Sequence, residues 1–205
     1  GLDFETRLSA KTNTAERLRA ELGKRGYVVS PINLGANTDP YQPIERKYRL
    51  TRQVLEILAE TRHPATIVTK SANVLRDLDL LAPMARERLV QVFVSVTTLD
   101  NQLASRLEPR ASAPHRRLQA IGELAGAGVP VVVFVAPLIP MLTDRDLEAI
   151  MDKARAAGAT TASYTLVRLP HEVADLFREW LAIHYPDRAA HIMSLGQQMR
   201  GGRDN

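Results

Sequence analysis

The chain has 205 residues, of which 45% are hydrophobic, and a formal net charge of +4. This composition excludes a disordered chain and predicts one folded domain over residues 1–199, followed by a polar, flexible tail at 200–205. The 27 basic residues share their helical stretches with the 23 acidic ones, so charge alone gives weak support to a nucleic-acid partner.

Three features that the sequence lacks narrow the class of protein. It has no cysteine, so these residues offer neither a disulfide nor a thiolate-ligated metal site, and the composition suits a reducing cytoplasm, where we expect the protein. The five histidines lack the spacing of a zinc site, so we predict no metal held by this sequence. No apolar run approaches the roughly 20 residues that cross a bilayer, so we expect no membrane association.

Short apolar segments rich in β-branched residues predict the strands. The five main ones are expected at 27–34, 65–69, 89–96, 129–136 and 161–167, with a further short strand at 7–11. The run at 90–96 is apolar almost throughout, which is typical of a parallel strand buried on both faces.

Stretches with helical spacing separate these strands and predict helices at 14–23, 43–60, 72–87, 114–127, 143–157 and 171–184. Asn13 or Thr14 is expected to cap the first helix, and Thr143 with Asp144 and Asp146 gives the fifth a charged start, whereas Gly128 and Gly158 stand where glycines end helices. Alternating strands and helices predict right-handed βαβ units. Because five main strands are too few for a closed eight-stranded barrel, the predicted α/β fold is an open, partial TIM-like barrel.

Polar residues that follow the strands are the first candidates for a site, because parallel α/β folds bind ligands at the carboxyl ends of their strands. Asn37, Thr38 and Asp39 follow the first main strand. Their amide, hydroxyl and carboxylate suit an ammonium group or a ribose hydroxyl, but a helix-entry turn built on Asp39 explains them equally well.

Lys70 ends the second main strand and precedes Ser71, a residue type that caps helices. A cation beside a helix N-terminus forms a site for a carboxylate or phosphate, although lone surface lysines are common. Ser95 lies in the third, otherwise apolar strand, where its hydroxyl requires a partner, and Thr97 continues the same polar rim.

Arg110 and Arg117 come after the third main strand, close to Glu108. An acid and two arginines at this place either clamp the carboxylate of a ligand or form ordinary ion pairs on a helix surface. Taken by themselves, Lys70 and the loop with Thr38 also fit a metal-independent phosphate- or sugar-binding α/β barrel enzyme, which is the alternative function.

Six segments, taken in order and spacing, resemble one family. They are GANTDPYQPIE at 35–45, VTKS at 68–71, VSVTT at 94–98, LEPR at 107–110, APLIP at 136–140 and RLPHE at 168–172. The chain is similar here to the radical S-adenosylmethionine (SAM) proteins of the spore photoproduct lyase-like group. The resemblance implies a [4Fe-4S] cluster on a Cys-x3-Cys-x2-Cys loop just before residue 1. We therefore expect the chain to be a fragment without its first βα unit and without bound cofactor.

The same resemblance implies a role for each candidate residue in binding SAM. Asn37, Thr38 and Asp39 would hold the amino end, Lys70 the carboxylate, and Ser95 the ribose or carboxylate, with Thr97, Arg110 and Arg117 on the same rim and Ile139 in the adenine pocket. The implied enzyme cleaves SAM reductively to a 5′-deoxyadenosyl radical that abstracts hydrogen. DNA repair is the implied setting and DNA the implied partner, while the substrate itself is left open. The cysteine-free fragment is expected to be inactive, and its exposed first edge strand is expected to pair into a dimer.

Overall fold

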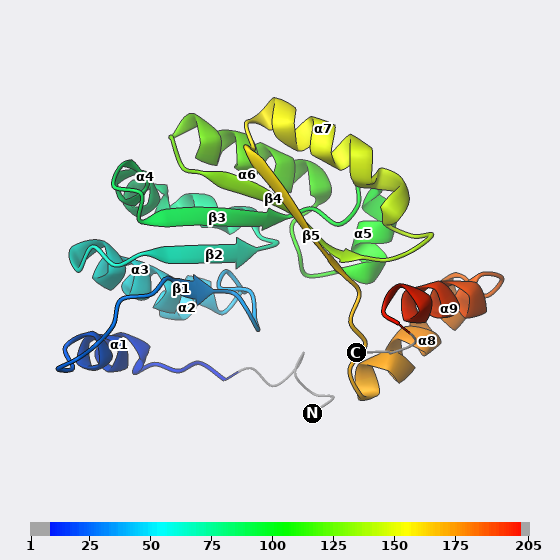
Figure 1. The fold of residues 1–205 in the computed structure, drawn as a ribbon, viewed down its shortest axis with the longest axis horizontal. Coiled ribbons are helices and arrows are strands. Elements are labelled where there is room, and N and C mark those ends of the chain that lie inside the picture. Colours follow the sequence, from blue (N-terminus) through cyan, green and yellow to red (C-terminus); the bar gives the residue numbers. More distant parts are fainter. Residues whose placement is uncertain (1–8, 202–205) are drawn as a thin grey trace.

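The structure of the protein, a computed structural model, describes residues 9–201 (Figure 1). Within that range one parallel sheet has the strand order β1-β2-β3-β4-β5. Its strands are β1 (Ile32–Leu34), β2 (Ala65–Thr69), β3 (Val90–Ser95), β4 (Val131–Leu138) and β5 (Thr161–Leu166). Each strand pairs with the next one along the chain, and in these residues the sheet does not close, so the predicted open, partial TIM-like barrel is confirmed.

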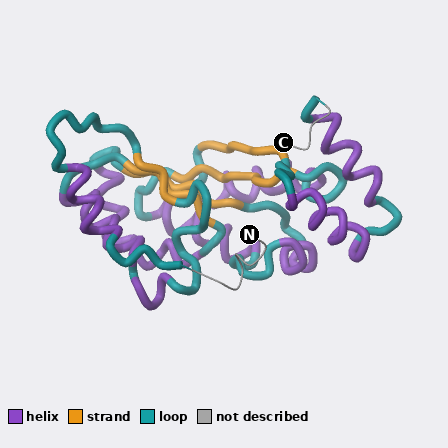
Figure 2. Tube along the Cα trace, turned by 90° about the horizontal axis from the view of Figure 1, so that it is seen from below, coloured by secondary structure: helices purple, strands orange, loops and turns teal. Residues whose placement is uncertain are grey.

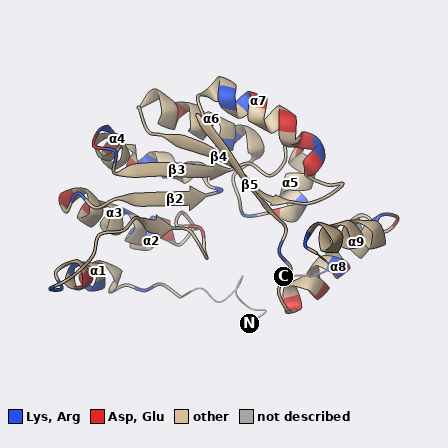
Figure 3. Cartoon of the chain, viewed as in Figure 1, with Lys and Arg blue, Asp and Glu red and all other residues tan. Residues whose placement is uncertain are grey.

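The helices cover one face of the sheet and extend beyond its carboxyl end. They are α1 (Thr14–Leu22), α2 (Glu45–Tyr48), α3 (Leu50–Glu60), α4 (Leu78–Arg86), α5 (Asn101–Leu107), α6 (Pro114–Gly126), α7 (Leu147–Ala157), α8 (Glu172–His184) and α9 (Ala189–Met199), with 3₁₀ turns η1 (Ala72–Asp77) and η2 (Asp144–Asp146). The sequence did not predict α5 and α9. Lys and Arg share most helices with Asp and Glu, as expected (Figure 3).

The main core lies between the sheet and the helices on one of its faces (Figure 2). On that face Ile67, Val92 and Val133 are at most 2% exposed. Phe93 and Phe134 point to the other face, where their rings pack edge to face at 6.1 Å, and they are only partly buried. The expectation of strands buried on both faces is therefore wrong for the described residues, because the apolar run at 90–96 includes side chains of an uncovered face.

The predicted helix 43–60 is broken at Arg49, which adopts the left-handed conformation with φ 51° and ψ 36°. Glu45 makes this break stable: its Oε1 accepts hydrogen bonds from the backbone amides of Thr51 and Arg52, at 3.0 and 3.3 Å. These are amides of the first turn of α3 that a cap has to satisfy. Helical spacing alone could not reveal the break, since the spacing continues through it.

Several predicted element ends differ from the structure. Residues 27–31 form a loop, so β1 is shorter than predicted; of the predicted strand 7–11, residues 7 and 8 lie outside the described residues and 9–11 are not a strand. Asn13 does not cap α1 with its side chain, and Thr14 is the first residue of that helix. Thr143 precedes η2 and makes no side-chain cap there. The Thr143 hydroxyl instead accepts a hydrogen bond from the Ile139 amide at 2.8 Å and so shapes the turn after β4.

Helices α8 and α9 form a second, smaller cluster beyond the carboxyl ends of β4 and β5 (Figure 1). Leu181 and Ile192 are at most 1% exposed there and pack with Leu142 and Val167. This cluster bounds the carboxyl end of the sheet, where the candidate site lies.

Candidate functional site

The carboxyl ends of β1, β2 and β3, with the loops that follow them, form what we call the rim. A cavity of about 450 Å³ lies there, within the size range of ligand sites. It is lined by Asp39, Tyr41, Gln42, Pro43, Lys70, Ser71, Leu107, Glu108, Pro109, Arg110 and Ala111. The structure thus brings Asp39, Lys70 and Arg110 to one cavity from three separate parts of the sequence.

Asp39 anchors the loop after β1 to the end of β2. Its Oδ1 accepts hydrogen bonds from the Tyr41 amide and the Thr69 hydroxyl, both at 2.8 Å, and its Oδ2 accepts one from the Lys70 amide at 2.7 Å. The first of these is the bond of an Asx turn, so the interpretation as a turn residue is correct for Asp39. Asn37 and Thr38 are exposed on the loop that this anchor holds.

Gly35, at the start of the same loop, allows the close approach. It has φ 101°, and a Cβ atom there would stand 2.1 Å from the Val68 carbonyl oxygen. A side chain at residue 35 would push the loop away from β2.

Lys70 and Arg117 share one carboxylate, that of Glu108. The Lys70 Nζ lies 2.6 Å from Glu108 Oε1, and the Arg117 Nη2 lies 2.6 Å from Oε2. Lys70 is one-third exposed at 33%, while the Arg117 side chain is 2% exposed. Lys70 can therefore contact a ligand. Arg117 is buried below the rim and supports it through its ion pair with Glu108.

The remaining donors of Arg117 are engaged by the protein. Its Nε donates to the Ser112 carbonyl and its Nη1 to the Ser95 carbonyl, at 2.5 and 3.1 Å. Thr97 is also occupied, since its hydroxyl donates to Glu108 at 2.7 Å. Ser95 and Thr97 are at most 2% exposed, so both lie behind the rim together with Arg117.

Glu108 stays ionised despite its position. Burial raises the pKa of its carboxyl, but the charges of Lys70 and Arg117, with hydrogen bonds from Lys70 and Thr97, outweigh burial and leave the pKa below its ordinary value. The sequence pointed to Glu108 as an acid after the third strand, but not to its position between two cations.

Ile139 lies elsewhere. It is 1% exposed and lines a neighbouring, largely apolar cavity of about 410 Å³ with Val167, Leu169 and Trp180. Leu107 and Pro109 line both cavities, so the two adjoin. The rim thus offers a charged compartment next to an apolar one.

An open parallel α/β barrel with its candidate ligand site at the strand ends is the class that this fold defines. The chain belongs to the radical SAM superfamily, whose sequence profile matches residues 7–154. This membership confirms the resemblance seen in the sequence and favours it over the metal-independent alternative.

Relatives of this chain are longer than it is. The uncharacterized protein Rv2578c of Mycobacterium tuberculosis is 35% identical over 197 residues, which make up 95% of this chain and 58% of that protein. The uncharacterized protein MJ0683 of Methanocaldococcus jannaschii is 28% identical over 167 residues, 82% of this chain and 61% of that protein. The chain therefore spans about three fifths of the length of these relatives.

Among solved structures, the fold is similar to that of spore photoproduct lyase with bound AdoMet and dinucleoside spore photoproduct. The TM-score is 0.62 at 18% identity, over 88% of this chain and 53% of that chain. At this identity the likeness establishes the shared fold.

The superfamily implies SAM and an iron–sulfur cluster as cofactors. The residues in hand do not fit the cluster, because the sequence has no cysteine to supply a thiolate. They do fit SAM, since a lysine-bearing cavity adjoins an apolar one. In residues 9–201 no three His, Asp or Glu side chains are grouped to hold a metal ion, and no helix of that range has the length and hydropathy to span a membrane.

Proposed function

We propose that this chain forms the SAM-binding part of a radical SAM enzyme. The observation that carries the proposal is Lys70: its ammonium group reaches the rim cavity from the end of β2 and stays partly exposed. A cation at this place suits the carboxylate of SAM. Glu108 and Asp39 hold the side chain and the backbone of Lys70, respectively, in a fixed position.

The other candidate residues around Lys70 differ in how far they are exposed to a ligand. Asn37 and Thr38 are exposed and available to the amino end of SAM, and Arg110 lines the cavity. Ser95, Thr97 and Arg117 act through the buried network around Glu108. Ile139 belongs to the apolar compartment, which suits the adenine ring.

In the proposed enzyme the cofactors supply the bond-breaking chemistry, and the protein binds and orients them. A reduced cluster and SAM would supply the radical chemistry of the superfamily, reductive cleavage of SAM and hydrogen abstraction, while Lys70 and the rim of this chain would bind and orient SAM. Cysteines outside these 205 residues would hold the cluster, so the chain alone is proposed to be inactive. We also propose a cytoplasmic setting and a DNA substrate in repair, supported by the cysteine-free composition and by the fold shared with spore photoproduct lyase.

Replacing Lys70 with alanine in the full-length, cluster-containing protein tests the proposal. We expect Lys70→Ala to weaken SAM binding by roughly 1.5–3 kcal/mol, the value of a charge-assisted hydrogen bond, and to suppress 5′-deoxyadenosine formation. Equilibrium dialysis and product chromatography measure these effects.

Lys153→Ala is the matched control, because Lys153 is exposed on α7 and away from the rim. It should leave both readouts unchanged, and the cluster absorption spectrum should be the same in all three proteins. Wild-type affinity and cleavage in Lys70→Ala would show that the SAM carboxylate is not bound at the end of β2.

A further inference from the structure

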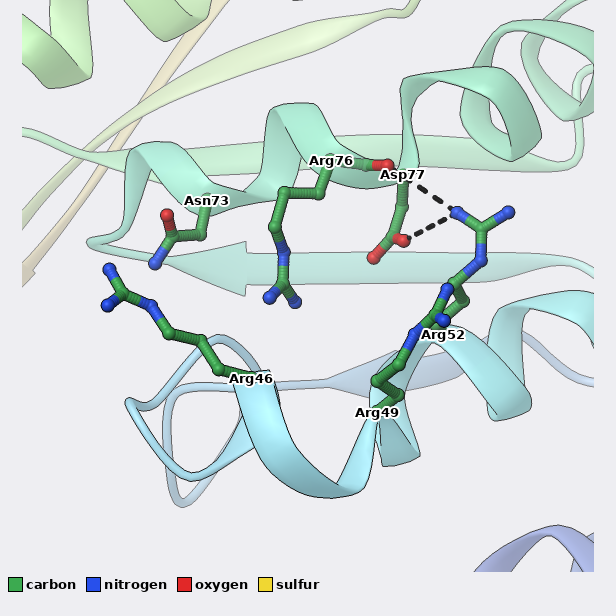
Figure 4. Close-up of a pocket in the computed structure, with 6 residues that line it drawn as sticks. All are labelled: Arg46, Arg49, Arg52, Asn73, Arg76 and Asp77. Atoms are coloured by element: carbon green, nitrogen blue, oxygen red, sulfur yellow. Dashed lines mark hydrogen bonds and ion pairs between the residues drawn. The ribbon is translucent and has the colours of Figure 1, made fainter.

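A second cavity lies beside β2, between α2 and η1 (Figure 4). Its volume is about 490 Å³, and it is lined by Arg46, Arg49, Arg52, Asn73, Arg76 and Asp77. We call it the arginine pocket. Helices elsewhere mix basic and acidic residues (Figure 3), whereas this lining has four guanidinium groups and one carboxylate.

The carboxylate of Asp77 is paired with Arg52 through Oδ1, whereas its buried Oδ2 has no hydrogen-bond partner in the described part of the chain. Arg52 lies 3.0 Å from Asp77 Oδ1, 2.6 Å from Asp79 Oδ2 and 3.1 Å from Glu56 Oε1. Asp79 and Glu56 are more than half exposed, so water screens their charges. Arg52 is thus engaged by ion pairs within the protein. The guanidinium groups left for a ligand are those of Arg46, Arg49 and Arg76.

Those three cations have few protein partners. Within residues 9–201 no ion pair engages Arg46 or Arg49, and Arg76 has a distant one, 4.0 Å from Glu45 Oε1. Glu45 Oε1 is itself occupied by backbone amides of α3. Among the described residues, the charges of Arg46 and Arg49 are thus not compensated by ion pairs, whereas Arg76 keeps one distant carboxylate partner.

The backbone places Arg46, Arg49 and Arg76 so that all three line the same cavity. Arg49 takes the left-handed conformation at the junction of α2 and α3, which is costly for a residue with a Cβ atom. Arg76 comes from η1, and its guanidinium carbon lies 5.8 Å from the centroid of the Tyr41 ring, a cation–π contact that holds the side chain. Figure 4 shows Arg46 and Arg76 extending into the pocket from opposite sides.

We propose that the arginine pocket binds a phosphate group. Guanidinium groups donate in planar forks that match phosphate oxygens, and a tetrahedral phosphate accepts from several directions at once. Three such groups, two from α2 and its junction with α3 and one from η1, together with the amide of Asn73, suit it better than a planar carboxylate. A phosphate group of this kind occurs both in a nucleic-acid strand and in a small phosphorylated molecule.

This phosphate site is distinct from the proposed SAM site but next to it. Tyr41 lines the rim cavity, and its ring contacts Arg76, which lines the arginine pocket. The proposal does not depend on SAM binding, because none of the lining arginines belongs to the rim.

Binding to the full-length protein tests this site, with orthophosphate as the probe in titration calorimetry. The double variant Arg46→Gln/Arg49→Gln should lose roughly tenfold or more in affinity, as should Arg76→Gln from the opposite side of the pocket. The matched control Arg116→Gln/Arg155→Gln removes two exposed arginines of α6 and α7 and should bind as wild type. All variants should keep the wild-type melting temperature and SAM affinity.

A fluorescent oligothymidylate distinguishes the two sources. If a strand supplies the phosphate, its affinity falls in the pocket variants, and the slope of log K against log salt falls by about 1.4 for two lost contacts to a single strand. A selective loss for orthophosphate alone assigns the site to a small phosphorylated molecule. Unchanged binding of both probes by the pocket variants, or an equal loss in the α6–α7 control, overturns the proposal.

Discussion

Arg117 shows that a candidate site residue can be identified from the sequence while the burial of its side chain is predicted wrongly. Its type and position predicted a clamp for a ligand or a surface ion pair, whereas it is 1% exposed and all its contacts given above are with the protein. Burying a guanidinium requires a carboxylate partner and filled donors. Glu108 supplies that partner, and the pairing depends on the fold of residues 95–117, which spacing does not reveal.

The charge of Glu108 should make stability depend on pH. Because the folded-state pKa is lowered, Glu108 stabilises the fold above its ordinary pKa of 4.5, and this contribution is lost as the pH falls below that value. Glu108→Gln should cost roughly 3–5 kcal/mol at pH 7, since Lys70 and Arg117 lose their counter-charge. The variant should also lose less further stability on acidification than wild type does.

Urea unfolding at pH 7 and at pH 3.5 measures both effects. Glu123→Gln is the control, because Glu123 is exposed on α6 and should change neither value. A Glu108→Gln protein with wild-type stability and acid sensitivity would contradict the role of this carboxylate.

At the scale of elements, four turns from helix to strand share one geometry. Arg62, Arg88, Gly128 and Gly158 all have positive φ, and in each case the next residue donates its amide to the carbonyl five residues before it, as in His63 to Leu58. This is the Schellman arrangement that ends helices. The sequence revealed the two glycine turns, whereas arginine carries no such signal, so the turns before β2 and β3 could not be predicted in this way.

Replacing arginine with glycine at such a turn should stabilise the protein. Arg88→Gly removes the cost of a left-handed residue with a Cβ atom, about 1–2 kcal/mol, and adds the smaller entropic cost of glycine, for a net gain of roughly 0.5–1 kcal/mol. Gly158→Ala should act in the opposite direction, because φ is 108° and the new Cβ would lie 2.7 Å from Ala125 Cβ. Thermal unfolding of the two variants measures this. A lower melting temperature for Arg88→Gly would refute the explanation.

The strand-end residues of the candidate site could be predicted from the sequence, whereas the residues around them could not. Lys70 and Asp39 were located because the apolar runs before them mark strand ends, and strand ends meet at one edge of a parallel sheet. The arginine pocket was missed because its members stand in two stretches of helical spacing, and its shape depends on the break at Arg49.

For the whole molecule, the sequence predicted an exposed first edge strand, and the structure gives the described sheet two edges of different character. β1 has three residues, whereas β5 has six, and its Tyr164 is 64% exposed. A longer edge offers more unpaired backbone groups to a second chain. We therefore expect self-association of the 205-residue chain to use β5 more than β1.

Lysines on the β5 edge should prevent this association. Ala162 and Tyr164 are both exposed and alternate along one face of β5, so Ala162→Lys/Tyr164→Lys places two charges where a second strand would pair. Sedimentation velocity over a range of concentrations should show wild type forming dimers or larger species and the double variant remaining monomeric. Ala149→Lys/Ala182→Lys adds the same charge on exposed positions of α7 and α8 and should associate as wild type does. A monomeric wild-type chain at every concentration, or equal association of the edge variant, would rule out pairing through β5.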